Sequence, residues 1–456
     1  MAKRSNGKPA EPAVPPSISR ITVSGFKSIG EEQSIDIAPL TILAGANSSG
    51  KSSIMQPLLL LKQTLECSYD PGALLLDGPN VKFTSSEQLI TLRVQANKET
   101  FFSVGVGTTA GGSIRTTFEK RPGKAIDVQL TEYDTNEGSL RINRNKSSNN
   151  YSFKSDIQWV NRGVERLEKD KKTLAVRSRC FLKPAYLQNE YVQPFEFEGV
   201  TQFDAIIKTS IHLPGHRGNP QRNYPVSADD LTFSSLIASD FEIGRSYSGT
   251  FEPYSASVIA GWQSAPKDSK LEQLTEDLVA LGLTWKVSAK RINEAHVELQ
   301  VGRLPKRSRS GTRDMVNIAD VGFGVSQVLP VLVALRVAKP GQLVYIEEPE
   351  LHLHPRAQSA MAEVIADAAS RGVRVVIETH SSLLILGIQT LVAEGKLNQS
   401  LVKLHWFQRD KEGMTKVTSR DLNEDGTFGD WPEDFADVTL NAQDRFLTAV
   451  ESRMGL

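Results

Sequence analysis

Short apolar runs alternate with longer stretches of helical periodicity in the C-terminal third of the chain. The apolar runs are QLVYIEE (342–348), VRVVIETH (373–380) and LVKLHWFQ (401–408). Apolar residues recur at helical spacing in the stretches 326–338, 355–371 and 382–395. This alternation is typical of a parallel sheet whose buried strands are covered by helices. The pattern therefore predicts an α/β fold for this part of the chain.

The N-terminal region has strands followed by one helix. Strand-like runs lie in ISRITVSGFKSI (18–29) and in QSIDIAPLTILAG (33–45). A glycine-rich turn follows, and SSIMQPLLLLKQTLEC (52–67) then carries apolar residues at helical spacing. We expect Pro57, inside that stretch, to bend the helix or to weaken one of its hydrogen bonds.

The middle of the chain has a different texture. Short alternating runs such as QLITLRVQA (88–96) and FFSVGVG (101–107) are interrupted by Gly, Asn, Asp and Ser, which indicates antiparallel strands. The segment 160–174 is charged and compatible with a helix, and 274–304 reads as a helix followed by strands. We therefore predict that this middle region forms a β-rich lobe with a helical insertion.

Five parts of the chain follow from these patterns. They are a disordered tail (1–17), an N-terminal segment of the main domain (18–84), the β-rich lobe with its helical insertion (85–310), a C-terminal segment of the main domain (311–410) and a small C-terminal domain (411–456). The tail is assigned from its Pro, Lys and Ala content.

Composition narrows the class of protein. Lys and Arg total 53 and Asp and Glu total 53, so the overall charge does not indicate nucleic-acid binding, although a local basic groove is compatible with it. Two cysteines, Cys67 and Cys180, argue against a disulfide framework and fit a reducing cytoplasm. The sequence has no apolar run near the roughly 20 residues that span a bilayer and no secretory signal at its start. We therefore expect a cytoplasmic protein with no membrane partner.

The glycine-rich turn matches the phosphate-loop pattern G-x-x-x-x-G-K-[ST]. Its residues are Gly45, Ala46, Asn47, Ser48, Ser49, Gly50, Lys51 and Ser52, followed by Ser53. Glycines let backbone amides turn toward phosphate oxygens, and the start of the next helix adds its positive end. Lys51 is expected to reach the β- and γ-phosphates, and the Ser52 hydroxyl to bind Mg²⁺. The sequence therefore predicts a site for ATP and Mg²⁺.

Two adjacent carboxylates follow the buried run at 343–346. Glu347 and Glu348 come at the carboxyl end of that strand, where ligands bind in such sheets. We assign Glu347 to Mg²⁺, directly or through water, and Glu348 to accepting a proton from the attacking water or aligning it. His352 and His354 alternate nearby and suggest either a zinc site or, in the interpretation we prefer, a structural or subunit-contact role.

A third polar group follows the apolar run 373–377. Glu378, Thr379 and His380 end this strand, and Ser381 or Ser382 is placed to cap the next helix. A histidine at such a strand tip can contact a γ-phosphate. We predict this catalytic contact for His380, against the alternative of an ordinary strand-end histidine.

Together, these motifs resemble those of ABC-type P-loop ATPases of the SMC-like branch, close to OLD-like and RecF-like ATPases. GANSSGKSS is similar to their Walker A motif, LVYIEEPELHLHP to their Walker B motif and D-loop, and IETHSS to their switch-histidine segment. The resemblance covers about 17–60 and 315–410 and implies an ABC-type head that binds and hydrolyses ATP.

DVGFGVSQVLPVLVAL (320–335) occupies the place of the ABC signature motif in this resemblance. In such families two protomers enclose two nucleotides, and the signature segment of one faces the phosphate loop of the other. The resemblance thus implies a homodimer or higher homo-oligomer in which Gly322, Gly324 and Ser326 contact the partner's ATP. Gly322 stands where a serine is common, so whether Ser326 supplies that hydroxyl stays open.

The C-terminal segment also resembles a known one. SRDLNEDGTFGDWPEDFADVTLNAQDRFL (419–447) is similar to the small uncharacterised domain of some stand-alone prokaryotic ATPases of this group. It either packs back onto the ATPase core or docks a partner, with Trp431, Pro432 and Phe435 as apolar anchors. OLD nucleases carry a TOPRIM nuclease domain after the ATPase, and the residues after His380 are too few for one. We therefore expect any nuclease to be a separate effector protein.

Basic residues suggest further contacts. Arg217 and Arg222 lie in a Gly/Pro-rich loop at 211–226 and suit either phosphate recognition or a structural salt bridge. Other basic residues gather in two groups: Lys169, Lys171, Lys172, Arg177 and Arg179, and Arg303, Lys306, Arg307, Arg309 and Arg313. They either line a DNA groove or belong to solvated loops.

The resemblance leaves three functions open. The first is an ATPase that acts as sensor or scaffold for a separate effector in prokaryotic anti-phage defence. The second is a RecF-like DNA repair ATPase, for which DNA is the partner. The third is a nucleotide-gated interaction module whose hydrolysis is incidental.

Overall fold

The structure is a computed structural model. It describes residues 15–92, 100–145, 151–157, 175–188, 191–194, 198–226, 245–265, 268–304 and 314–429, and four single residues beyond 444. Most of the predicted tail at 1–17 lies outside these residues. So do Trp431, Pro432 and Phe435 and most of the basic residues in the two predicted groups.

A six-stranded sheet forms the centre of the molecule, in the order β12-β17-β18-β3-β19-β20. Its strands are β3 (Leu40–Gly45), β12 (Ile211–Leu213), β17 (Leu343–Glu347), β18 (Arg374–Glu378), β19 (Val402–Arg409) and β20 (Thr415–Asp421). All neighbouring pairs are parallel except β19 and β20. The predicted parallel sheet and the α/β fold class are confirmed.

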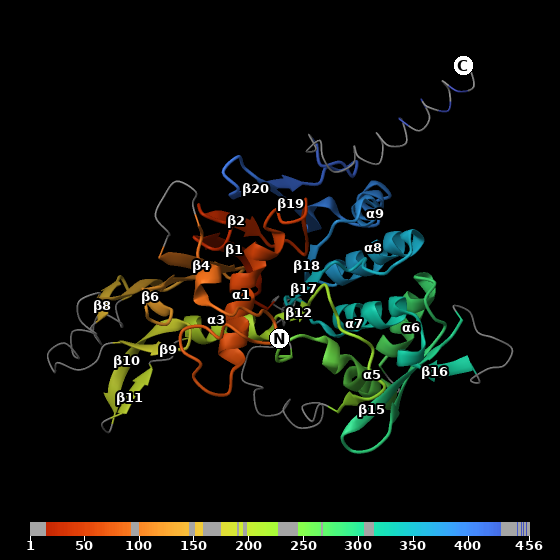
Figure 1. Cartoon of the computed structure of the whole chain (residues 1–456), viewed down its shortest axis with the longest axis horizontal. Coiled ribbons are helices and arrows are strands. Elements are labelled where there is room, and N and C mark those ends of the chain that lie inside the picture. Colours follow the sequence, from red (N-terminus) through yellow and green to blue (C-terminus); the bar gives the residue numbers. More distant parts are fainter. Residues whose placement is uncertain are drawn as a thin grey trace, which may run out of the picture.

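Helices cover one face of the central sheet, where alternate residues such as Ile42, Val344 and Ile377 enter one apolar core. The helices of this core are α5 (Ser255–Ser264), α6 (Lys270–Ala280), α7 (Phe323–Val337), α8 (Pro355–Ser370) and α9 (Ser382–Ala393). They group together on the same side of the sheet in Figure 1. No helix in the described ranges is long and apolar enough to cross a bilayer.

The opposite face of the central sheet packs on α1 (Lys51–Glu66) and on a second sheet. Leu43, Tyr345 and Phe407 alternate with the residues of the first core and join this second one. Pro57 lies inside α1, and the helix continues through it. Because consecutive strand residues point to opposite faces, the four strands β3, β17, β18 and β19 contribute to both cores. The nearly continuous apolar runs in the sequence reflect this double burial.

The second sheet has seven antiparallel strands in the order β2-β1-β4-β5-β6-β7-β8. Their bounds are β1 (Ile18–Ser24), β2 (Gln33–Asp36), β4 (Phe101–Thr108), β5 (Ser113–Glu119), β6 (Asp127–Thr135), β7 (Gly138–Arg144) and β8 (Tyr151–Ser155). The first two strands therefore pair with the β-rich region and not with β3, although they adjoin β3 in sequence.

Smaller elements complete the fold. A three-stranded sheet contains β9 (Ala175–Ser178), β10 (Phe181–Gln188) and β11 (Tyr191–Pro194), and α3 (Glu198–Thr209) follows it. Another sheet contains β13 (Tyr224–Pro225), β14 (Val287–Arg291), β15 (His296–Gly302) and β16 (Met315–Asn317). The predicted domain boundaries stay predictions. The structure adds that β12, from the middle of the chain, and β20, from the predicted small C-terminal domain, both belong to the central sheet.

Candidate functional site

The predicted phosphate loop joins the carboxyl end of β3 to the start of α1. Three of its residues have positive φ: Gly45 (140°), Ser48 (60°) and Gly50 (107°). The first turn of α1 contains no acidic residue, and no side chain caps its amides. Its N–H groups and the positive end of the helix therefore remain for an anion.

The hairpin of β19 and β20 supports this loop from behind. A Cβ on Gly45 would lie 2.2 Å from the Phe407 carbonyl oxygen, and one on Gly50 would lie 2.2 Å from Thr415 Oγ1. The Thr415 hydroxyl also donates to the Ser49 carbonyl at 2.8 Å. Both glycines are therefore required by close packing as well as by their backbone angles.

A cleft of about 500 Å³ opens beside the loop. Its lining residues are Lys27, Ser28, Asn47, Ser48, Gly50, Lys51, Ser52, Ser53, Gln56, Glu348, Glu378, His380 and Arg409. The structure thus brings the predicted residues Lys51, Ser52, Glu348 and His380 to one cleft within a single chain, although they come from three distant segments.

Lys51 faces its own loop. Its ammonium group donates to the carbonyls of Gly45 at 3.0 Å and Ala46 at 2.9 Å. Burial lowers the pKa of Lys51, and the charges of Glu378 and Glu348 act in the opposite direction. Among the described residues, the ammonium group donates hydrogen bonds only to these two loop carbonyls. A phosphate oxygen carries negative charge and would therefore be a stronger acceptor for it.

Glu347 and Glu378 end the neighbouring strands β17 and β18 and are paired in register. Glu347 Oε1 lies 3.2 Å from His212 Nε2, and Glu347 Oε2 accepts a hydrogen bond from the Gly215 N–H at 3.1 Å. Glu378 accepts one hydrogen bond from Ser52 Oγ at 2.9 Å. Glu378 is therefore the carboxylate that is hydrogen-bonded to Ser52, the predicted Mg²⁺ ligand. Glu347 instead faces His212.

The pKa values of these two carboxyls shift in opposite directions. Burial would raise the pKa of Glu347, but the hydrogen bonds from His212 and from the Gly215 amide outweigh burial and lower it. Burial raises the pKa of Glu378, and the nearby charge of Glu347 raises it further. A cation bound in the cleft would relieve this raised pKa by favouring the ionised form of Glu378.

Glu348 sits at a constrained turn after β17. Its φ is 46°, which is uncommon for a residue with a side chain, and its N–H donates to the Glu378 carbonyl at 2.7 Å. Arg217 donates to the Glu347 carbonyl at 2.5 Å and to the Glu348 carbonyl at 3.1 Å. This backbone arrangement places the Glu348 side chain along the cleft.

His380 follows the end of β18 and lines the cleft. Its N–H donates to Glu350 Oε1 at 3.0 Å, and the Thr379 hydroxyl donates to the same oxygen at 2.7 Å. Burial lowers the pKa of His380, and the charge of Lys51 lowers it further, whereas Glu348 opposes them. These contacts fix the backbone from which the imidazole reaches the cleft.

The predicted signature residues lie elsewhere. Gly322 precedes α7, and Gly324 and Ser326 are in its first turn, where Ser326 Oγ donates to the Phe323 carbonyl at 3.0 Å. None of the three lines the cleft of its own chain, and the Phe323 side chain is 53% exposed. Their contact with a nucleotide of a second copy stays a prediction.

Other polar residues that the sequence analysis considered for a role make contacts within the fold. Arg222 forms an exposed ion pair with Asp320 at 2.5 Å. The His354 side chain caps α8 by accepting from the Arg356 N–H at 3.4 Å. In the described parts of the chain, no group of three or more His, Cys, Asp or Glu side chains could hold a metal ion by itself.

Several cleft residues were not predicted as site residues. Glu378 had a usable signal, because it ends an apolar strand next to His380. The sequence carries no comparable signal for the other three, which are Lys27, Gln56 and Arg409. Each is an ordinary polar residue of its segment. Arg409 Nε donates to the Ser48 carbonyl at 2.7 Å, and Lys27 Nζ donates to Gln56 Oε1 at 2.6 Å.

These features fit ATP with Mg²⁺. The uncapped amides of α1 and the ammonium group of Lys51 suit a polyphosphate, and the hydroxyl of Ser52 with the carboxylate of Glu378 supplies the hard oxygen ligands that Mg²⁺ prefers. The buried Ser49 Oγ has no hydrogen-bond partner among the described residues, which leaves another donor in the loop.

Comparisons with known proteins agree with the predicted ATPase group. The family model described as "AAA domain, putative AbiEii toxin, Type IV TA system" matches residues 40–386. The chain is also 22% identical over 380 residues to "Old nuclease" of Escherichia phage P2. That match covers 81% of this chain and 57% of the relative, which is less than two thirds of its length.

Solved structures of SMC heads also match. An SMC head bound to the C-winged helix domain of ScpA is 13% identical, with a TM-score of 0.47, and the match covers 90% of this chain and 98% of that one. The SMC head domain from Thermotoga maritima is 7% identical, with a TM-score of 0.39, and the match covers 88% and 98%. Both TM-scores are below 0.5.

The predicted kinship with OLD-like ATPases is confirmed by the family match and the similarity to Old nuclease. The match at 40–386 begins at β3, includes the phosphate loop and both acidic strand ends, and extends over more than half of the 456 residues. This chain therefore belongs to the AAA_21 family of AAA domains.

Proposed function

We propose that this protein binds ATP with Mg²⁺ and hydrolyses it. The observation that carries the proposal is the single cleft shared by Lys51, Ser52, Glu348, Glu378 and His380. Membership of an AAA family supports ATP hydrolysis as its chemistry. The catalytic effect would come mostly from placing charges around the transferred phosphoryl group.

Each cleft residue has a separate part in this proposal. The amides of the phosphate loop and Lys51 bind the β- and γ-phosphates, and Ser52 holds Mg²⁺. Glu348 accepts a proton from the attacking water or aligns it, and His380 contacts the γ-phosphate. Bound Mg²⁺ would neutralise negative charge on the phosphates. Glu378, through its bond to Ser52, joins Glu347 as a second carboxylate for the metal.

We also propose that two copies enclose the nucleotides. The start of α7, with Gly322, Gly324 and Ser326, lies outside the cleft of its own chain, and Phe323 beside it is exposed. A second copy would bring this glycine-rich helix start to the phosphates, where backbone amides bind anions well.

ATP titration and light scattering test both proposals. Wild-type protein should hydrolyse ATP only with Mg²⁺, and Glu348→Gln should lower turnover by about 10²- to 10⁴-fold while it keeps ATP binding. With MgATP, Glu348→Gln should double in mass, whereas adding Gly324→Asp should keep it monomeric by placing a negative charge against phosphate. Glu363→Gln, on the exposed side of α8, is the matched control and should behave as wild type. Wild-type turnover in Glu348→Gln would refute its assigned role.

For the biological role, we propose a sensor or scaffold for a separate effector, such as a nuclease, in anti-phage defence. The relative from phage P2 is named a nuclease, and the family description names a toxin system, which supports a partner of this kind. Purification from the native operon with and without ATP should recover the effector in fixed stoichiometry. Tight, salt-sensitive binding to DNA ends without an effector would favour the repair function instead.

A further inference from the structure

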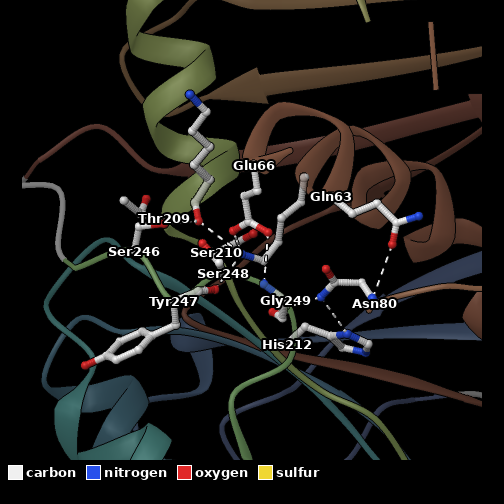
Figure 2. A network of polar contacts seen from close by, with 12 residues as sticks. Gln63, Glu66, Asn80, Thr209, Ser210, His212, Ser246, Tyr247, Ser248 and Gly249 are labelled. Carbon is white, nitrogen blue, oxygen red and sulfur yellow. Dashed lines mark hydrogen bonds and ion pairs between the residues drawn. The ribbon is translucent and has the colours of Figure 1, made fainter. Parts of the chain in front are cut away.

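A buried chain of polar contacts runs from helix α1 to the carboxylate of Glu347. It begins at Gln63 on α1, whose Oε1 accepts from the backbone N–H groups of Asn80 at 3.2 Å and Val81 at 3.0 Å. Gln63 Nε2 donates to the Leu75 carbonyl at 2.6 Å. The helix that starts at the phosphate loop therefore fixes the backbone that carries Asn80 (Figure 2).

The orientation of the Asn80 amide follows from its neighbours. Its Nδ2 donates to the Gly249 carbonyl at 3.0 Å and lies 3.2 Å from His212 Nδ1. A carbonyl oxygen can only accept, so the NH₂ group of Asn80 must be on this side. Its second hydrogen then points to His212 Nδ1, which accepts it. The hydrogen-bond network thus assigns the His212 proton to Nε2.

Gly249 is itself anchored to α1. Its N–H donates to Glu66 Oε2 at 3.0 Å, and Glu66 forms an ion pair with the fully buried Lys62. Lys62 Nζ also donates to the carbonyls of Lys208 at 3.1 Å and Tyr247 at 3.0 Å. Figure 2 shows Glu66 next to Gly249, and this contact holds in place the acceptor that orients Asn80.

His212 connects the fixed amide of Asn80 to the carboxylate of Glu347. Its Nε2 faces Glu347 Oε1 at 3.2 Å, its side chain is 1% exposed, and its ring stacks on Tyr345 with centroids 5.4 Å apart and planes at 9°. The Gly215 N–H holds the other carboxylate oxygen at 3.1 Å. Both oxygens of Glu347 therefore have a fixed donor, and these two contacts fix the orientation of the carboxylate.

We propose that Asn80 and His212 are positioning residues that orient Glu347 for the divalent cation of the ATP site. The proposal rests on the proposed function, because the cation accompanies ATP. Hydrogen-bonded partners behind a metal-binding carboxylate fix its orientation and typically change metal affinity by about 10- to 100-fold when they are removed. A purely structural role of His212 would instead lower stability and leave metal affinity unchanged.

Manganese binding measures this directly. Mn²⁺ is titrated, with electron paramagnetic resonance detection, into full-length Glu348→Gln protein that holds bound ATP with no excess free ATP, so that neither hydrolysis nor metal binding by free nucleotide contributes. In this background, His212→Phe keeps a ring against Tyr345 and removes both nitrogens, and we expect Mn²⁺ affinity to fall by about 10- to 100-fold. His212→Gln keeps an N–H donor and should retain affinity within about 10-fold.

Two further variants complete the design. Asn80→Ala removes the donor that sets the His212 proton and should weaken Mn²⁺ binding by about 3- to 10-fold. His405→Phe is the matched control, because His405 is also buried and hydrogen-bonded on both nitrogens, to Ser419 Oγ and the Asp36 carbonyl, each at 2.8 Å. It should lower stability without changing Mn²⁺ affinity.

The outcomes separate this inference from the proposed function. Mn²⁺ affinity within about twofold of the parent protein in His212→Phe would overturn the inference and leave ATP binding intact. If His212→Phe does not fold, Asn80→Ala decides in the same way. A parent protein that binds no ATP would refute the proposed function, and the inference would fall with it.

Discussion

Strands β17 and β18 end side by side in the same amino acid, yet their two carboxylates differ. Glu347 and Glu378 are paired in register, and both lie mostly out of solvent. Glu347 is held by nitrogen donors of His212 and Gly215, and its pKa is lowered. Glu378 is held by the hydroxyls of Ser52 and Tyr345, and its pKa is raised.

The difference teaches that donors and neighbouring charge, not residue type or strand position, set the state of each carboxylate. Burial acts on both in the same direction. The pKa of Glu347 is lowered despite burial because His212 and the Gly215 amide both donate hydrogen bonds to it. The pKa of Glu378 is not lowered, because Glu347 adds a like charge next to it. The lowered pKa of Glu347 thus favours its ionised form without a metal. The ionised form of Glu378 would be stabilised more by a bound cation, because the pKa of Glu378 is raised.

Among the variants that test the difference between Glu347 and Glu378, Lys51→Met is expected to have the largest effect. The ammonium charge of Lys51 acts against the raised pKa of Glu378, so its removal should raise that pKa further. The same change removes a charged donor to phosphate, and ATP affinity should fall by about 10- to 100-fold. Calorimetric titration measures the affinity. Lys403→Met, whose ammonium pairs with Asp421 on the central sheet, should bind as wild type.

The variants Glu378→Gln and Glu347→Gln test the opposite pKa shifts of the two carboxyls in protein without metal or nucleotide. Glu378 has a raised folded pKa, so it loses stability as pH rises from its ordinary value of 4.5 through that pKa. Glu378→Gln should therefore become more stable relative to wild type at higher pH. Glu347 has a lowered folded pKa, so its stabilisation is present above pH 4.5 and is lost as pH falls through the folded pKa.

Glu347→Gln should accordingly become less stable relative to wild type as pH rises, by about 1–3 kcal/mol at neutral pH for the lost charged hydrogen bonds. Denaturant unfolding in EDTA between about pH 3.5 and 8 measures both variants across the ordinary carboxyl range. Parallel pH trends in the two variants would contradict the comparison. Exposed Glu363→Gln again provides the control.

The smallest effect is expected from Tyr345→Phe. This change removes the hydroxyl that donates to Glu378 Oε2 at 2.9 Å and keeps the ring that stacks on His212. Stability should fall by about 1 kcal/mol, measured by denaturant unfolding. The Tyr345 hydroxyl also helps to lower the pKa of Glu347, so Mn²⁺ affinity should fall slightly, by much less than in His212→Phe. A loss of Mn²⁺ affinity as large as that of His212→Phe would show that the two carboxylates are not independently held.

Much of the central sheet could be predicted from the sequence. Strands β3, β17, β18 and β19 are apolar because both of their faces are buried, and the helices between them have clear periodicity. The phosphate loop could be predicted because its glycines, Lys51 and Ser52 act within a few consecutive residues. Strands β1 and β2 are predicted as strands, but the pairing of β1 with β4 depends on residues some 80 to 90 positions away in sequence.

The candidate site was predicted less completely. Glu347 and Ser52 were both assigned to Mg²⁺, and the structure instead joins Ser52 to Glu378, which lies 326 residues away in sequence. His212 received no role, because nothing in its surroundings marks a histidine that will contact a carboxylate 135 residues later. Side-chain partners of this kind depend on which strands become neighbours, and β12 has only three residues to signal its place.

By itself, the sequence determined the local chemistry of this protein: a phosphate-binding turn before a helix, and apolar strands that end in acidic residues and a histidine. These features depend on neighbouring residues and on side-chain periodicity, which the chain order fixes. Only the tertiary structure decided which carboxylate meets Ser52, which one meets His212, and that α1 reaches Glu347 through Asn80. Those pairings require strand order and close packing of distant segments, because hydrogen bonds act only over about 3 Å.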